Sequence, residues 1–280
     1  VGDVNSTIAC ALVATKKDIA VVHVEAGLRS GDRRMPEEIN RVLTDQISDL
    51  LFTTEPDGEI NLLREGVDPN RVHFVGNVMI DTLLANRVRA IPAAQTLGEI
   101  EGFPADKGDF GLLTLHRPSN VDSPAVLRRL LETLVEISER LPLVFPIHPR
   151  TRARVKDAGL DSLLARARIG LTEPLGYLQL LGIMEKSRLI LTDSGGLQEE
   201  STALGVPCIT LRENTERPIT VTAGTNTIVG TDPVKIRSCF DDVMASGGKA
   251  GRIPDLWDGH AAERIAARLL EWADRRADAA

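Results

Sequence analysis

The chain has 280 residues, of which 42% are hydrophobic, so it is long enough to bury the cores of two domains. Aromatic residues make up only 3% of it, a composition that favours parallel sheets covered by helices over an all-β sandwich. The formal net charge of −7 argues against a nucleic-acid partner and against a membrane-surface partner.

Short apolar runs predict the strands of buried sheets. Most are apolar throughout rather than alternating, as expected for parallel strands covered on both faces. In chain order the predicted strands are residues 20–24, 50–53, 72–75, 110–115, 143–147, 168–171, 189–191 and 208–211. Helical patterns separate them, so the sequence predicts βαβ units in doubly wound sheets.

One of the predicted helices, over residues 36–48, begins at Pro36, a residue that suits the first helical position. Its apolar residues recur at helical spacing, the pattern in which an apolar stripe faces a core. They are Ile39, Val42, Leu43 and Ile47.

Glycines and prolines interrupt the periodicity over residues 91–109 and predict a domain boundary there. We expect a first domain part at 1–95, a second domain at 96–258, and a C-terminal helix over 259–280 that packs back on the first domain. Because the first part opens at the end of a strand, we expect the chain to lack the start of its first domain.

Ligands of open α/β sheets bind beyond the carboxyl ends of the strands, so the residues after each apolar run carry the functional interest. After strand 189–191 comes Thr-Asp-Ser-Gly-Gly at 192–196, followed by a helix. The glycines let backbone N–H groups approach phosphate oxygens, and the helix N-terminus adds partial positive charge. Ser194 is a further donor, and Glu199 or Glu200 could accept from ribose hydroxyls. The alternative is a tight turn whose glutamates favour the helix dipole.

Three carboxylates mark the first part of the chain. Glu25 closes the strand at 20–24, Glu37 opens the next helix, and Asp3 closes an earlier strand. Clustered carboxylates repel one another and raise the pKa of at least one, which separates acid and base roles. The alternative is a surface network in which Glu37 pairs with Arg41 at i,i+4.

Two histidines each follow a strand and each have an arginine nearby. His116 is followed by Arg117, and Arg150 lies two residues after His148. A lone histidine is more often structural, but this repeated arrangement favours an anion site. We interpret the remaining histidines as structural: His23, His73 and His260.

These segments belong to a longer set of motifs. In chain order they are Gly-Asp-Val-Asn-Ser-Thr at 2–7, His-Val-Glu-Ala-Gly-Leu-Arg-Ser-Gly-Asp at 23–32, Met-Pro-Glu-Glu-Ile-Asn-Arg at 35–41, Gly-Asn at 76–77, Leu-His-Arg-Pro at 115–118, His-Pro-Arg at 148–150, Thr-Asp-Ser-Gly-Gly-Leu-Gln-Glu-Glu at 192–200 and Thr-Glu-Arg-Pro at 215–218. Each is weak alone, but the set resembles the non-hydrolysing UDP-N-acetylglucosamine (UDP-GlcNAc) 2-epimerases, in family order across most of the chain.

The resemblance implies an α/β fold of two Rossmann-like doubly wound parallel-sheet domains, similar to the B-type glycosyltransferases, with the first domain truncated and UDP held mainly by the second. It implies reversible epimerisation of UDP-GlcNAc to UDP-N-acetylmannosamine (UDP-ManNAc). UDP is eliminated to leave 2-acetamidoglucal and then adds back. The product feeds cell-surface polysaccharide synthesis. No cofactor and no metal is required.

The resemblance also assigns site residues. The catalytic carboxylates match Asp3, Glu25 and Glu37, and the catalytic histidine matches His116; which of them is acid and which is base stays open. The substrate-binding residues match Arg117, His148, Tyr177, Leu180, Ser194, Gly195, Gly196, Glu200 and Arg217. By the same resemblance, the turn at Ser194, Gly195 and Gly196 holds the diphosphate and Glu200 contacts the ribose. Tyr177 and Leu180 lie near the uracil. His148 and Arg217 line the nucleotide site or a neighbouring regulatory pocket.

The sequence departs from the family at its start, where it has no Gly-Thr-Arg-Pro-Glu motif to supply an arginine to the diphosphate and part of a regulatory site. We therefore expect these 280 residues alone to be poorly active. The implied partners are UDP-GlcNAc, as substrate and as allosteric activator, and a second copy in a homodimer, with no nucleic acid and no membrane. Three scattered cysteines without metal-ligand spacing indicate a reducing cytoplasm. The alternatives are a hydrolysing 2-epimerase releasing ManNAc and UDP, a glycosyltransferase of the same fold, and a non-catalytic UDP-sugar-binding protein.

Overall fold

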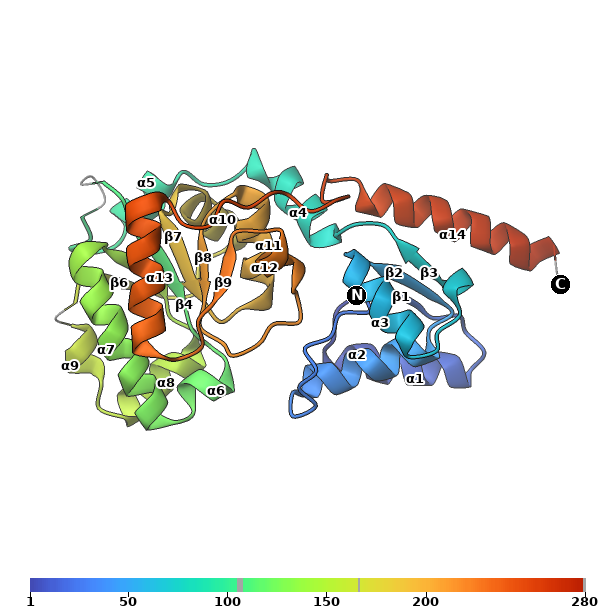
Figure 1. Cartoon of the computed structure of the whole chain (residues 1–280), viewed down its shortest axis with the longest axis horizontal. Helices are drawn as coiled ribbons and strands as arrows, with labels where there is room; N and C mark the ends of the chain where they lie inside the picture. Colours follow the sequence, from blue (N-terminus) through green and yellow to red (C-terminus); the bar gives the residue numbers. More distant parts are fainter. Residues whose placement is uncertain (105–107, 166, 279–280) are drawn as a thin grey trace. The chain divides into compact units, whose positions relative to one another are not determined.

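The structure, a computed structural model, describes residues 1–104, 108–165 and 167–278. The chain divides into two compact units, each with its own parallel sheet (Figure 1). The first unit comprises Val1–Ala85, Glu216–Ile219 and Pro254–Ala280, and the second comprises Asn86–Thr215 and Thr220–Ile253. The prediction of an α/β chain with two parallel sheets is confirmed.

The first unit has three parallel strands in the order β1-β2-β3. They are β1 (Val22–Ala26), β2 (Leu50–Thr53) and β3 (Val72–Phe74). Its helices are α1 (Asn5–Lys16), α2 (Pro36–Ile47), α3 (Pro56–Arg64), the short 3₁₀ turn η1 (Pro69–Arg71), α4 (Val78–Arg87), which runs into the second unit, and α14 (Ala261–Asp278).

Helices cover both faces of β2, which is buried along its whole length. Successive side chains of a strand point to opposite faces. Accordingly Leu51 packs in one cluster with Leu62 of α3, while Leu50 and Phe52 pack in another with Ile265 of α14. The apolar run at 50–53 is therefore a doubly covered strand, as its composition predicts.

Among the described residues, the second unit has six parallel strands in the order β6-β5-β4-β7-β8-β9. They are β4 (Gly111–Thr114), β5 (Leu143–Pro146), β6 (Ile169–Thr172), β7 (Leu189–Thr192), β8 (Cys208–Thr210) and β9 (Asn226–Ile228). The chain first builds outward from β4 to β6 and then returns to build from β7 to β9. The order therefore reverses between β4 and β7, the switch point where doubly wound sheets bind ligands.

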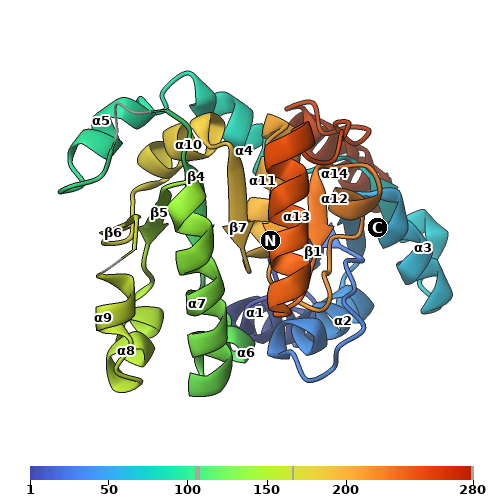
Figure 2. The same cartoon turned by 60° about the vertical axis from the view of Figure 1, so that its left-hand side comes forward.

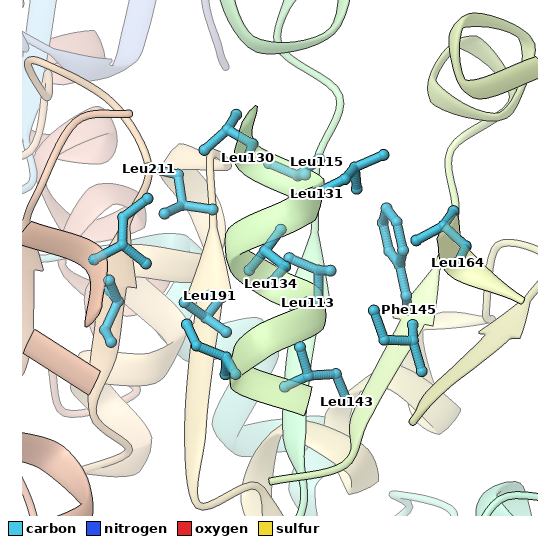
Figure 3. Packing of buried hydrophobic residues seen from close by; sticks show 14 of the residues in the cluster. Leu113, Leu115, Leu130, Leu131, Leu134, Leu143, Phe145, Leu164, Leu191 and Leu211 are labelled. Carbon is cyan, nitrogen blue, oxygen red and sulfur yellow. The ribbon is translucent and has the colours of Figure 1, made fainter. Parts of the chain in front are cut away.

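The helices of the second unit lie on both faces of this sheet. They are α5 (Ala93–Gly98), α6 (Pro118–Val121), α7 (Pro124–Arg140), α8 (Pro149–Asp157), α9 (Asp161–Leu164), α10 (Tyr177–Lys186), α11 (Gly195–Leu204), α12 (Ile219–Thr222), whose first residue belongs to the first unit, and α13 (Pro233–Ser246). Figure 2 shows α7 and α13 packed side by side over one face. In Figure 3, Leu130, Leu131 and Leu134 of α7 meet Leu113 of β4 and Leu191 of β7. No helix that the structure describes is long and apolar enough to cross a membrane.

All eight predicted strands form, but the strand expected before Asp3 is absent and one observed strand is not predicted. Residues 1–4 contain no strand, so Asp3 lies in the bend before α1 rather than at a strand end. The edge strand β9 is not predicted, because its three residues, Asn-Thr-Ile, are not an apolar run.

The apolar residues of α2 were expected to face a core, but the structure exposes this face of the helix. Ile39 and Leu43 are 47% and 48% exposed. The buried positions of the helix are polar or charged: Glu38, Asn40, Arg41, Thr44 and Asp45. The physical reason is that two of these buried groups, Glu38 and Asp45, hold the loop before the helix, as described below.

The chain passes from one unit to the other at residues that differ from the boundaries expected from the sequence. From Asn86 onward the segment up to residue 95 belongs to the second unit, where Ile91 N–H donates to the carbonyl of Leu178 in α10 (3.0 Å). The segment before residue 258 joins the first unit, where Trp257 Nε1 donates to the Thr54 carbonyl (3.0 Å). Residues 279–280 of the predicted C-terminal helix lie outside the described residues.

Candidate active site

A pocket of about 200 Å³ opens in the second unit at the carboxyl ends of β4, β5 and β7. Four of the predicted site residues line it: His116, His148, Leu180 and Ser194. Leucine and proline side chains form most of the remaining wall. The structure thus brings these four residues together at the switch point of the sheet, where the sequence predicts a ligand.

The turn from β7 to α11 places a helix N-terminus at this pocket. Ser194 occupies the N-cap position, with Gly195 as the first residue of α11, and in the described chain no side chain caps that end. The Ser194 N–H donates to Thr192 Oγ1 (3.0 Å), whose hydroxyl bonds the Thr114 hydroxyl of β4 (2.6 Å). The amides of Gly195 and Gly196 therefore open a helix whose partial positive charge suits an anion.

Asp193, just before this turn, holds the segment after β4. It is completely buried and accepts hydrogen bonds from the backbone N–H groups of His116 (3.0 Å) and Arg117 (2.9 Å) and from Asn120 Nδ2 (3.1 Å). Its Oδ1 also lies 2.9 Å from His116 Nδ1. Burial opposes its ionisation, but the hydrogen bond and charge of His116, with the two backbone N–H groups, outweigh burial and lower the pKa of Asp193. The sequence interpretation gave Asp193 no role, although its place at a strand end was a usable signal.

His148 lies beside His116, with the two ring centroids 5.9 Å apart. It caps the N-terminus of α8, and its Nδ1 accepts from the Arg150 N–H (3.2 Å). Both imidazoles are thus fixed by a bond at Nδ1, and both line the pocket.

The residues that the resemblance places near uracil and ribose are bonded to each other. Tyr177, at the start of α10, donates its hydroxyl hydrogen to Glu200 Oε1 of α11 (3.0 Å). Burial raises the pKa of Glu200, and the Tyr177 hydroxyl opposes that rise. Burial, followed by the charge of Glu200, raises the pKa of Tyr177. At neutral pH Tyr177 is therefore a hydrogen-bond donor.

Glu25 lies in the first unit with Arg217, which belongs to the segment Glu216–Ile219 of that unit. Glu25 Oε1 is 2.6 Å from an Arg217 nitrogen, and Arg217 also bonds Glu216 at 2.7 Å. The backbone of Glu25 has φ +76 at an irregularity of β1, a conformation that costs a non-glycine residue about 1 kcal/mol or more. Strain of this kind is common at functional sites, which fits the prediction for Glu25. Arg217, expected at the nucleotide site or a neighbouring pocket, meets a predicted catalytic carboxylate.

The other two predicted carboxylates meet α2. Asp3 Oδ2 lies 2.6 Å from Arg41, and the side chain of Asn40 donates to the Asp3 carbonyl (2.9 Å). Arg41 also bonds Glu38 at 2.7 Å. Glu37 lies in the first turn of the same helix and is half-buried. Asp3 and Glu37 are therefore both placed by α2, with Arg41 bound to Asp3 and Glu38.

Two buried acids of α2 hold the loop that follows β1. Asp45 lies 2.5 Å from His23 Nδ1 and 2.7 Å from Arg29, and Glu38 accepts from the N–H of Ser30 (3.0 Å). Buried charges must be paired, so the helix turns its charged face inward to meet this loop. Among the described residues, no group of three or more His, Cys, Asp or Glu side chains could hold a metal.

Comparisons with known proteins agree with this geometry. A family model described as UDP-N-acetylglucosamine 2-epimerase matches residues 1–270. The UDP-N-acetylglucosamine 2-epimerase of Methanocaldococcus jannaschii is 45% identical over 274 residues, 97% of this chain and 74% of that protein. The UDP-2,3-diacetamido-2,3-dideoxy-D-glucuronate 2-epimerase of Pseudomonas aeruginosa is 42% identical over 232 residues, 82% of this chain and 62% of that protein. A crystal structure of the M. jannaschii UDP-GlcNAc 2-epimerase in complex with UDP-GlcNAc and UDP aligns with a TM-score of 0.85 at 45% identity, covering 97% of this chain and 74% of that one.

Proposed function

The chain belongs to the UDP-N-acetylglucosamine 2-epimerase family and is an isomerase, and from this premise we propose that it interconverts UDP-GlcNAc and UDP-ManNAc at C2 without releasing the sugar. The observation that carries the proposal is the pocket of the second unit. There an imidazole, His116, lies in one wall with Ser194 and the N-terminus of α11. A proton-transfer group thus stands beside a site for the leaving diphosphate.

The proposed chemistry is an elimination followed by a re-addition. The C2–H bond breaks, its electron pair forms the C1=C2 double bond of 2-acetamidoglucal, and the C1–O bond breaks so that UDP leaves with the negative charge. Inversion requires that a proton leaves one face of C2 and returns to the other, so two groups are a minimum. We assign proton transfer jointly to Asp3, Glu25, Glu37 and His116, and stabilisation of UDP to the helix N-terminus at Ser194.

A second candidate substrate follows from the Pseudomonas aeruginosa relative. Its identity to this chain, 42%, is close to the 45% of the M. jannaschii protein. A UDP-2,3-diacetamido-2,3-dideoxyglucuronate would undergo the same change at C2 while differing at C3 and C6. The same assay with both nucleotide sugars distinguishes them, because only the preferred substrate reaches a high kcat/KM.

The test of the proposed function is incubation with UDP-GlcNAc in deuterated water, followed by NMR. The expected result is UDP-ManNAc that approaches an equilibrium mixture, with deuterium at C2 of both sugars. Free ManNAc with UDP would mean a hydrolysing enzyme, transfer to an added acceptor would mean a glycosyltransferase, and tight UDP-GlcNAc binding without exchange would mean a binding protein.

A variant isolates the chemical step from binding. Glu25→Gln is expected to reduce C2 exchange by about 10²-fold or more, the usual contribution of an acid–base group, while the affinity for UDP is retained. Glu271→Gln is the matched control, because this carboxylate is exposed on α14 and forms an ion pair with Arg268 of the same helix. Equal losses of exchange in both variants would contradict the assignment of Glu25.

We also propose the surroundings in which this reaction takes place. The chain forms a homodimer, is activated by a second molecule of UDP-GlcNAc, acts in the cytoplasm and feeds cell-surface polysaccharide synthesis. Sedimentation velocity tests the dimer, and sigmoidal dependence of rate on UDP-GlcNAc tests the activation.

A further inference from the structure

The two histidines of the pocket are held by partners of opposite kind. A neutral imidazole has one N–H hydrogen, which lies on either Nδ1 or Nε2. The hydrogen bond made by one ring nitrogen decides which nitrogen carries it. His116 and His148 each use Nδ1 for a bond to the protein. Their partners therefore determine what each ring offers at Nε2.

The partner of His116 can only accept a hydrogen. Asp193 Oδ1, at 2.9 Å from His116 Nδ1, belongs to a buried carboxylate whose Oδ2 already accepts from the backbone N–H groups of His116 and Arg117. An ionised carboxylate has no hydrogen to donate, so Nδ1 must carry the hydrogen. In the neutral ring Nε2 then has a free lone pair and can accept a proton.

The partner of His148 can only donate. The Arg150 backbone N–H points at His148 Nδ1, at 3.2 Å, where the imidazole caps α8. Nδ1 must therefore keep its lone pair, and the hydrogen of the neutral ring lies on Nε2. Loss of this cap would leave the end of the helix without the side-chain acceptor that the structure gives it.

We propose that His116 and His148 are held in opposite tautomers, with Asp193 as the positioning residue that makes His116 Nε2 a proton acceptor and the α8 cap making His148 Nε2–H a donor to an oxygen of the diphosphate. The pair of tautomers stands on geometry alone; the two chemical roles rest on the proposed function. When His116 Nε2 takes the proton released from C2, the ring becomes an imidazolium, which the Asp193 carboxylate stabilises. The C2–H electron pair forms the C1=C2 double bond, and the C1–O pair leaves with UDP. His148 then donates to the oxygen on which negative charge develops.

The first experiment reads the tautomers without any turnover. Long-range hydrogen–nitrogen NMR correlations of protein labelled with ¹⁵N-histidine distinguish a protonated Nδ1 from a protonated Nε2, and His116→Gln and His148→Gln assign the two rings. The expected result is hydrogen on Nδ1 of His116 and on Nε2 of His148. Either ring in the reverse tautomer, or both rings in the same one, overturns the proposal.

The second experiment tests the effect of the carboxylate on the reaction. Asp193→Asn removes the negative charge but keeps an oxygen for the backbone N–H groups. We expect kcat to fall about 10²-fold or more, with UDP affinity changed less than about 3-fold. In a His116→Gln background the same substitution should change kcat less than about 3-fold, because the ring it positions is gone. Asp157→Asn, an exposed acid at the end of α8, is the matched control and leaves both values unchanged.

A purely structural Asp193 predicts another pattern. It would give equal losses in both backgrounds and a parallel loss of UDP affinity, and this result overturns the positioning role. If Asp193→Asn does not fold, the tautomers of the unmodified protein decide. The proposed function fails separately, through absence of C2 exchange while the tautomers are as expected.

Discussion

Replacing Arg217 by methionine tests whether this arginine holds the predicted catalytic carboxylate Glu25. The Arg217 side chain is 9% exposed. Its guanidinium lies 2.6 Å from Glu25, whose side chain is 13% exposed, and 2.7 Å from Glu216, whose side chain is 2% exposed. Methionine keeps much of the apolar stem but removes the positive charge that both carboxylates share. Removing one partner of a buried ion pair costs about 3–5 kcal/mol, and the slight exposure of Glu25 places the expected loss near about 3 kcal/mol.

The two tryptophans give an assay for the first unit alone. Trp257 and Trp272 are the only ones in the sequence, and both belong to that unit. Trp257 is buried with its indole bound to a backbone carbonyl, so its fluorescence changes on unfolding. With a urea dependence of about 2 kcal/mol per M, a loss of about 3 kcal/mol lowers the midpoint of the fluorescence transition by about 1.5 M.

A double-mutant cycle tests whether Arg217 and Glu25 stabilise the first unit as a pair. Glu25→Gln removes one of the two buried charges, so in the Arg217→Met background it should recover about 1–2 kcal/mol rather than cost more. Arg268→Met, which loses a half-exposed pair with Glu271, should cost less than about 1 kcal/mol by the same fluorescence assay. If Arg217→Met costs as little as Arg268→Met, or if the effects of Arg217→Met and Glu25→Gln simply add, the pair does not hold Glu25 and the interpretation is refuted.

Three further predictions concern the second unit. Ser194→Ala should weaken UDP binding by about 5–10-fold in calorimetry through the loss of one hydrogen bond at the helix N-terminus, and an unchanged affinity would place the diphosphate elsewhere. Gly182→Ala should destabilise this unit by about 2 kcal/mol or more, read from the far-ultraviolet circular dichroism melt, because a Cβ there would lie 1.8 Å from the Ile91 carbonyl oxygen; an unchanged melt would contradict that approach. The folded pKa of Asp193 lies below its unfolded value, so its stabilisation is full above pH about 4 and is lost as pH falls through the folded pKa. Acid titration of Asp193→Asn, followed by the emission of the single tyrosine, Tyr177, should therefore show a shallower loss of stability than the unmodified chain, and equal slopes would contradict the lowered pKa.

The sheets were predictable because buried parallel strands leave a local signature. A strand covered on both faces needs apolar residues at every position, and runs such as those of β5 and β7 have no other simple interpretation in a chain of this composition. The edge strand β9 lacks that signature. Its buried Asn226 is acceptable because its amide bonds Gln198 of α11 (3.2 Å) and Thr220 (3.0 Å), partners that the local sequence does not identify.

Helix α2 shows where periodicity misleads. The spacing of apolar residues along a helix distinguishes its two faces but not which of them is covered, and the rule that the apolar face is buried assumes that the covering surface is apolar. Here the covering surface includes the loop after β1, whose backbone N–H groups and Arg29 require acceptors. Glu38 and Asp45 supply them, so the polar face is buried and Ile39 and Leu43 remain exposed.

The candidate site, too, could be predicted only in part, because some of it follows from local sequence and the rest from contacts between residues distant in the chain. The rule that ligands lie beyond strand ends is local, and with the motifs of the family it found His116, His148 and Ser194, which the fold brings to one pocket. It could not say what each side chain bonds. His116 and Asp193 are 77 residues apart, and Glu25 and Arg217 are 192 apart, so both pairs exist only because strands or segments distant in the chain become neighbours. Those pairings determine the chemistry, because an imidazole becomes a base or a donor, and a carboxylate is paired or free, according to its partner. A motif therefore identifies which residues form a site, while the topology of the sheet determines what those residues can do there.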